Sequence, residues 1–130
     1  MIRRSLHVAI AVVALAAPTA LTACGSDDTP AIASYGEVSP DETADYEYVV
    51  PYGTSVRINA GQVVDLMPQY LEVRVGETIR IKNQDSRDYM IGPFFVAAAQ
   101  TLSMRFTQEG TLSGTCTMNP EGIFEIKVLP

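Results

Sequence analysis

The sequence predicts one small all-β domain, a two-sheet Greek-key sandwich that follows an N-terminal export segment. Short runs of β-branched and aromatic residues recur with turn signals between them, and no stretch shows a sustained period of 3.6 residues. Alternation is clearest in 71–75 and 78–82, where apolar residues are expected on one face and charged residues on a solvent-facing side. About a hundred residues follow the export segment, enough for one domain with a hydrophobic core.

The first residues have the two-part pattern of an export signal. Arg3 and Arg4 precede an apolar run over 8–17, and Pro18 follows it. This run has about half of the roughly 20 residues that a helix needs to cross a bilayer, so it is not expected to span one. The two arginines fit either general secretory export or twin-arginine export, and the sequence leaves both open.

A lipid-attachment site is predicted directly after this signal. Residues 21–24, Leu-Thr-Ala-Cys, resemble the bacterial lipobox, in which the cysteine thiol receives a lipid before cleavage. This predicts a signal peptide over 1–23 and Cys24 as the first mature residue, holding the protein at the outer face of the cell membrane. The alternative is a plain secretory signal cut near Ala23, which would leave Cys24 an ordinary thiol.

Charge and composition narrow the function classes. The net charge is −6, and removing residues 1–23 takes away two arginines and no acid, which leaves −8. Such a balance argues against nucleic acid and against electrostatic docking on anionic lipid. Residues 24–45 are rich in Ser, Thr, Pro and acids, so a disordered acidic tether is expected there and the domain over 46–130.

Turn signals divide the predicted domain into short strands. Glycines and the Asn119-Pro120 pair separate the runs of β-forming residues. The expected strands are 46–50, 54–58, 62–66, 69–75, 77–83, 90–96, 101–107, 111–115 and 122–128. The three alanines at 97–99 interrupt this pattern, and a short helical turn is expected there.

The stretch 71–130 resembles the cupredoxin family of small blue copper proteins. Residues 73–85 (VRVGETIRIKNQD) are similar to the paired strands that lead to the family's first copper histidine, and 114–120 (GTCTMNP) to its carboxy-terminal ligand loop. The resemblance implies a cupredoxin-like sandwich. It also implies a copper site at which Cys116 would be the thiolate ligand.

The histidines that such a site requires are missing. A blue copper centre needs two imidazoles and a thiolate in one plane, with a weak axial thioether. By the resemblance, Tyr89 stands at the first histidine position and Asn119 at the second, and only Cys116 matches. The sole histidine of the chain is His7, inside the predicted signal. The sequence therefore predicts a degenerate copper site and no resident cofactor.

Without histidines, the candidate metal ligands that the sequence still offers are soft sulfur atoms. Met118 lies two residues beyond Cys116, on the same face if the loop is extended, and Met90 adjoins Tyr89. Thiolate with thioethers favours Cu(I), whereas methionines and a buried cysteine also simply fill cores. The core-filling interpretation is the expected one, with a Cu(I) carrier or sensor using Cys116, Met118 and Met90 as the alternative. Met67 and Met104 have no predictable position.

The predicted function is non-enzymatic. The chain is expected to be a lipid-anchored extracytoplasmic binding or accessory module whose partners are the membrane, through the anchor, and envelope membrane proteins. Asp85 and Asp88 are expected to set a turn through backbone hydrogen bonds rather than to act in catalysis. A thiol-reactive role for Cys116 is the remaining rival, although no cation is its sequence neighbour.

Overall fold

The computed structural model describes residues 33–118 and 122–130, which form nine strands and one short helix. The strands are β1 (Ser34–Glu37), β2 (Tyr46–Val50), β3 (Tyr70–Arg74), β4 (Thr78–Asn83), β5 (Tyr89–Ile91), β6 (Phe94–Val96), β7 (Thr101–Gln108), β8 (Gly110–Thr115) and β9 (Ile123–Leu129). The helix is α1 (Thr54–Asn59). Cys24 and Asn119 lie outside the described residues.

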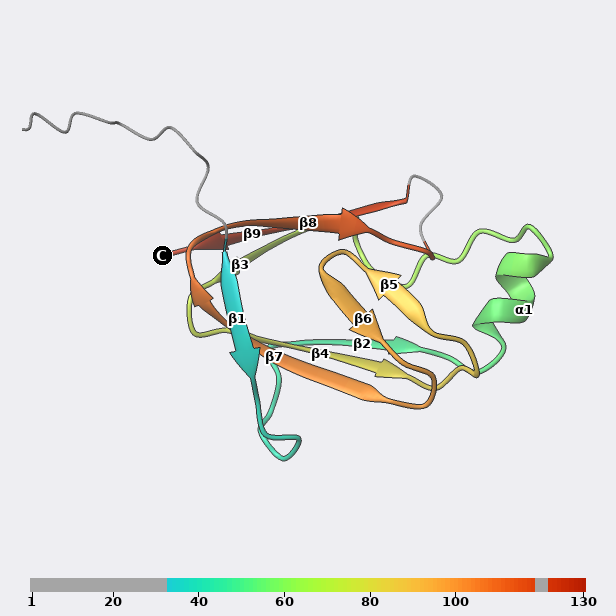
Figure 1. Ribbon diagram of the computed structural model, residues 1–130, viewed down its shortest axis with the longest axis horizontal. Coiled ribbons are helices and arrows are strands. Elements are labelled where there is room, and N and C mark those ends of the chain that lie inside the picture. Colours follow the sequence, from blue (N-terminus) through green and yellow to red (C-terminus); the bar gives the residue numbers. More distant parts are fainter. Residues whose placement is uncertain (1–32, 119–121) are drawn as a thin grey trace, which may run out of the picture.

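The strands form two principal sheets that face each other. One has the order β1-β7-β4-β2 and the other β3-β9-β8, while β5 and β6 form a separate hairpin. Both sheets are mixed, since β2 runs parallel to β4 and β3 parallel to β9. In Figure 1 the two sheets are the lower and upper layers, the hairpin lies between them, and α1 lies at one end. The predicted all-β, two-sheet sandwich is confirmed.

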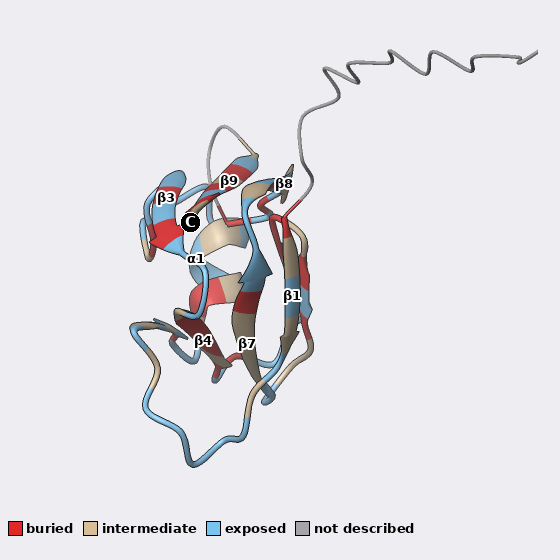
Figure 2. Ribbon diagram, turned by 90° about the vertical axis from the view of Figure 1, so that its left-hand side faces the viewer, coloured by how far each residue is buried: buried red, intermediate tan, exposed pale blue. Residues whose placement is uncertain are grey.

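The core fills the space between the sheets. Alternation along the strands supplies it: β3 buries Leu71 and Val73, and β9 buries Phe124, Ile126 and Val128. Figure 2 shows the resulting bands of buried and exposed residues along the strands. The period-2 pattern of the sequence therefore identifies which side chains point inward.

The domain begins earlier than expected. The predicted tether over 24–45 includes β1, which pairs antiparallel with β7, and Ala33 before it is 4% exposed. Further along, Asp45 accepts hydrogen bonds from the backbone N–H and the hydroxyl of Thr78 at 2.8 and 2.9 Å. Residues 33–45 thus belong to the sandwich. Their polar composition does not predict this, because the segment is attached to the sheet through hydrogen bonds of its backbone and of a carboxylate group.

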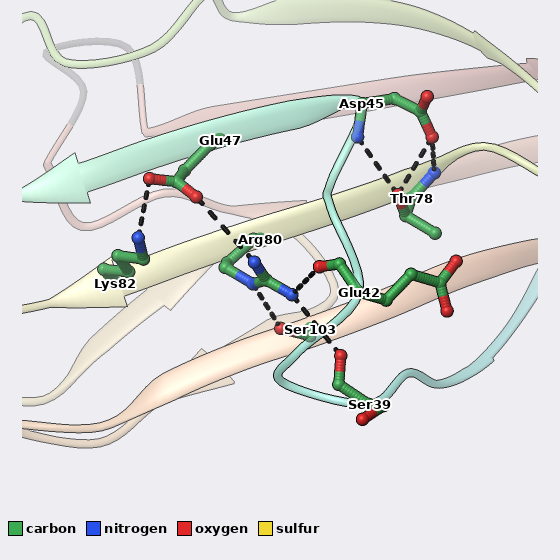
Figure 3. A network of polar contacts seen from close by, with 8 residues as sticks. All are labelled: Ser39, Glu42, Asp45, Glu47, Thr78, Arg80, Lys82 and Ser103. Carbon is green, nitrogen blue, oxygen red and sulfur yellow. Dashed lines mark hydrogen bonds and ion pairs between the residues drawn. The ribbon is translucent and has the colours of Figure 1, made fainter.

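Arg80 holds this N-terminal segment on the sheet. Its Nε donates to the Ser103 hydroxyl at 2.9 Å and its Nη2 donates to the backbone carbonyls of Ser39 and Glu42, as Figure 3 shows. Arg80 was expected to face solvent, yet it is only 8% exposed because the segment lies over it. A cation under a loop needs such acceptors, since an unpaired buried charge is costly.

Two expected strands are absent. Residues 54–58, rich in β-branched residues, form α1 instead, and 62–66 form no strand. The strand propensity of these residues is overridden because α1 receives an N-terminal hydrogen-bond acceptor from a distant part of the chain.

In the described ranges, no helix has the length and apolarity needed to cross a membrane.

The β5–β6 hairpin is fixed by a close backbone approach. Residues 90–96 were expected as one strand, but Gly92 adopts a positive φ of 60° and turns the chain. Its N–H donates to the Thr115 carbonyl at 2.9 Å, and Ile91 forms a bridge with Cys116. A Cβ on Gly114 would lie 2.3 Å from the Gly92 carbonyl oxygen. Only glycine at position 114 allows this approach.

A Gly114→Ala substitution should therefore destabilise the protein by about 2–3 kcal/mol, the range of an overpacked core, because its methyl group would meet backbone that cannot rotate away. Urea unfolding would measure this. Gly36→Ala is the matched control, since its Cβ would meet only the Thr107 methyl at an ordinary 3.9 Å. Equal stability of the two variants would contradict the assignment.

Candidate functional site

The buried carboxylate of Asp85 organises the end of the sandwich that carries α1. Its Oδ1 accepts the backbone N–H groups of Gly53 and Ser86 at 3.1 and 2.9 Å. Its Oδ2 accepts the backbone N–H of Ser55 and the hydroxyl of Tyr89, both at 2.6 Å. Asp85 is 2% exposed, so its charge depends on these four donors. One side chain thus caps α1, sets its own turn and holds β5.

The electrostatics of Asp85 follow from this arrangement. Burial by itself would raise the pKa of Asp85, but hydrogen bonds from the Tyr89 hydroxyl and from the Ser55 and Ser86 backbone outweigh it, and the pKa lies well below its usual range. The folded state therefore favours the ionised carboxylate. Its stabilising contribution is present above the unfolded pKa near 3.9 and is lost as the pH falls through the lower folded value.

Tyr89 is the other half of this pair. It is 1% exposed, and burial together with its hydrogen bond to the Asp85 carboxylate raises its pKa to about 12. The neutral phenol is thus favoured in the folded state, so its contribution holds below about pH 10 and is lost between about 10 and 12. The position that the family resemblance assigns to the first copper histidine therefore holds a buried hydrogen-bond donor.

Asn83 completes the network around Asp85. Its amide nitrogen donates to the carbonyls of Arg87, Val96 and Ala97 at 2.8, 3.2 and 3.0 Å, and its oxygen accepts the Asp85 N–H at 3.0 Å. The expected helical turn at 97–99 is instead a tight turn with Ala99 at a φ of 57°. The strain at Ala99 is offset by the hydrogen bonds of the Asn83 side chain. It is also offset by the Ala99 N–H, which donates to the Asp85 carbonyl at 3.2 Å.

Cys116 lines a cavity of about 350 Å³. Met118 lines the same cavity, and the two are 3% and 5% exposed, while Thr117 between them faces solvent. The segment is not extended as expected, because Thr117 and Met118 lie in a turn, yet Cys116 and Met118 both line the cavity. The other described residues that line it come from the segment between α1 and β3: Val63, Val64, Asp65, Leu66, Met67, Pro68 and Gln69.

The structure separates two groups of candidate residues. Met90 is 39% exposed on β5 and is not among the residues that line the cavity, so the proposed partnership of Met90 with Cys116 and Met118 is not supported. Met67, 9% exposed, lies there instead. Met104 packs on the core from β7.

Type 1 copper, which the resemblance implies, does not fit the residues present. In residues 33–118 and 122–130 no three His, Cys, Asp or Glu side chains gather where an ion could bind. Tyr89 offers a phenol already committed to Asp85. The planar set of two imidazoles and a thiolate therefore cannot be assembled from these side chains.

Sequence reasoning missed two residues at this end of the molecule. Asp85 was expected only to set its own turn, but it reaches Gly53 and Ser55 across about 30 positions of sequence, a contact that local patterns do not reveal. Met67 sits in a segment without regular structure, so no periodicity could place it near Cys116.

Replacement of Asp85 by Asn should cost about 3 kcal/mol at pH 7, because the amide NH2 that replaces one carboxylate oxygen is itself a donor and cannot accept the two hydrogen bonds made to that oxygen. The difference from the natural chain should shrink below about pH 4, where the native carboxylate loses its own contribution. Urea unfolding at several pH values measures both effects.

The matched control for this test is Glu109→Gln, which neutralises an exposed carboxylate and should have little effect. A difference between Asp85→Asn and the natural chain that is negligible, or that stays constant from pH 7 to pH 3, would contradict the described role of Asp85.

Comparisons with known proteins gave results for structure only. No protein-family model matches the chain, and no curated protein matches it. Among solved structures, amicyanin from Paracoccus versutus is 13% identical over 73% of this chain and 97% of its own, with a TM-score of 0.46. A purple cupredoxin from Nitrosopumilus maritimus is 20% identical over 65% of this chain and 100% of its own, with a TM-score of 0.40. A mutant amicyanin in its reduced Cu(I) form is 15% identical over 74% of this chain and 92% of its own, with a TM-score of 0.43. These are distant similarities, and the metal and partners of those proteins are not carried over to this chain.

Proposed function

We propose that the chain is a lipid-anchored, extracytoplasmic binding or accessory module that carries no type 1 copper and catalyses no reaction. The observation that carries this proposal is the hydrogen bond between Tyr89 and Asp85, at 2.6 Å and buried from solvent. The family resemblance assigns a metal-binding imidazole to position 89. In this structure that position holds a phenol whose hydroxyl is hydrogen-bonded to a carboxylate. Cys116 alone cannot supply a blue copper site.

The proposal that the chain catalyses no reaction is supported by the structural roles of the two groups whose pKa values are strongly shifted. Strongly shifted pKa values often mark catalytic residues. Here the pKa values of Asp85 and Tyr89 are strongly shifted, and both groups are buried and bonded to each other, with backbone donors completing the shell of Asp85. After removal of residues 1–23 the chain has no histidine, so histidine-based acid–base chemistry is absent.

Anchoring is supported by the sequence before the domain. Cys24 precedes the first described residue, Ala33, by nine positions. A fully extended chain of that length spans at most about 30 Å. Because β1 already belongs to the sandwich, the domain would be held closer to the bilayer than a tether reaching residue 45 would place it. This favours partners that are themselves membrane proteins.

In a bacterium that expresses the full chain and is fed a clickable fatty-acid analogue, the natural protein should become labelled and remain with the membrane fraction. Cys24→Ser should abolish the label because no thiol is left at the attachment position. Cys116→Ser, the matched control, should be labelled normally. Label retained in Cys24→Ser, or lost in Cys116→Ser, would contradict anchoring through Cys24.

The copper prediction uses the full chain carrying His7→Ala and Cys24→Ser, purified in detergent, so that Cys116 is its one thiol and no imidazole is present. One equivalent of cupric ion should give no intense blue colour, because the thiolate-to-copper absorption of such centres needs the two-imidazole geometry. Visible absorption spectra measure this. A blue band at one equivalent that disappears on adding Cys116→Ser would overturn the proposal.

A further inference from the structure

Three sulfur side chains that are remote in sequence line one cavity. Cys116 and Met118 come from the loop after β8, and Met67 from the segment before β3. All three are at most 9% exposed. From these residues we infer a binding site for a monovalent soft metal ion, Cu(I), with Cys116 as thiolate ligand and Met67 and Met118 as thioether ligands. The inference rests on the proposed function, since it requires that the cysteine is not part of a type 1 centre.

The cavity distinguishes this site from a filled core. Methionines that serve only as packing close the gaps around them, because interiors approach the density of organic crystals. Here the three sulfur residues border a hollow of about 350 Å³ instead. Among its lining residues Val63 and Asp65 are exposed, so the hollow opens to solvent and an ion can enter it.

The donor set selects the kind of ion. Thiolate and thioether sulfur favour Cu(I), whereas Ca²⁺ and Mg²⁺ require oxygen ligands. Structural Zn²⁺ sites use four Cys or His ligands, and the described residues contain one cysteine and no histidine. Among the described residues that line the cavity, Asp65 is the only carboxylate. A three-sulfur site is therefore matched to a soft monovalent ion.

Charge balance also favours a monovalent ion. Binding of Cu(I) displaces the thiol proton of Cys116, which passes to solvent, and no electron is transferred. The pair of Cu⁺ and thiolate has no net charge, so it is compatible with surroundings that are largely apolar: Val63, Val64, Leu66 and Pro68. A divalent ion there would leave a net positive charge with little polar compensation.

The backbone around the site is held by contacts outside it. The Cys116 N–H donates to the Gly122 carbonyl at 2.8 Å, and the Thr117 N–H to the Met90 carbonyl at 2.9 Å. On the other wall, the Glu125 N–H donates to the Gln69 carbonyl at 2.9 Å, which fixes the segment that carries Met67 to β9. The two walls are thus positioned by the sandwich before any ion arrives, which lowers the cost of binding.

The test is an anaerobic titration of the full chain carrying His7→Ala and Cys24→Ser with cuprous ion against a chromophoric Cu(I) chelator. One equivalent should bind. Cys116→Ser should weaken binding by about 100-fold or more, and Met67→Leu and Met118→Leu by on the order of tenfold each, in line with losses at metal sites. Met90→Leu is the matched control and should bind as the parent does.

Leucine preserves side-chain volume, so folding should be kept, and thermal unfolding checks this for each variant. X-ray absorption of the loaded protein should show only sulfur neighbours around copper. Failure to bind one equivalent, an effect of Met90→Leu equal to that of Met67→Leu, or oxygen or nitrogen neighbours would overturn the site. A cuprous titration without binding leaves the proposed function standing, whereas a blue cupric protein refutes that function separately.

Discussion

One buried negative charge determines the shape of the functional end of this molecule. The Asp85 carboxylate is removed from water, and four hydrogen bonds from N–H and O–H donors offset the lost hydration. Through them it caps the N-terminus of α1 at Gly53 and Ser55 and fixes Tyr89 on β5. The segment after α1 then forms one wall of the cavity over Cys116.

The sequence predicts the regular part of the sandwich well, because a sheet with one inward face imposes a period of two. Leu71 and Val73 are buried and Ile79 and Ile81 fully so, as their alternation indicates. The predictions that were wrong also have physical causes. Residues 54–58 have strand propensity, but a distant carboxylate supplies the acceptor that a short helix needs. Residues 33–45 look like a spacer because composition does not register backbone pairing with β7.

In the candidate site, too, some residue positions could be predicted from the sequence and others could not. A spacing of two residues predicts a shared face for Cys116 and Met118 only in an extended loop, whereas Thr117 and Met118 lie in a turn, so their common cavity depends on the path of that turn. Tyr89 is identified only through the family resemblance, and its bond to Asp85 follows from no spacing rule. Met67 and Cys116 line one cavity because the segments that carry them border the same hollow of the folded chain. Contacts of that kind depend on tertiary structure, so periodicity and motif spacing do not contain them.

The most direct test of this account is the ionisation of Asp85 itself. Carbon-13 NMR of the side-chain carboxyl, followed from pH 7 downward, should show no titration of Asp85 near the ordinary aspartate value of about 3.9 while the protein remains folded. In Tyr89→Phe the titration should move to higher pH, because a donor to the carboxylate is lost. An Asp85 that titrates at the ordinary value in the natural chain would contradict the account.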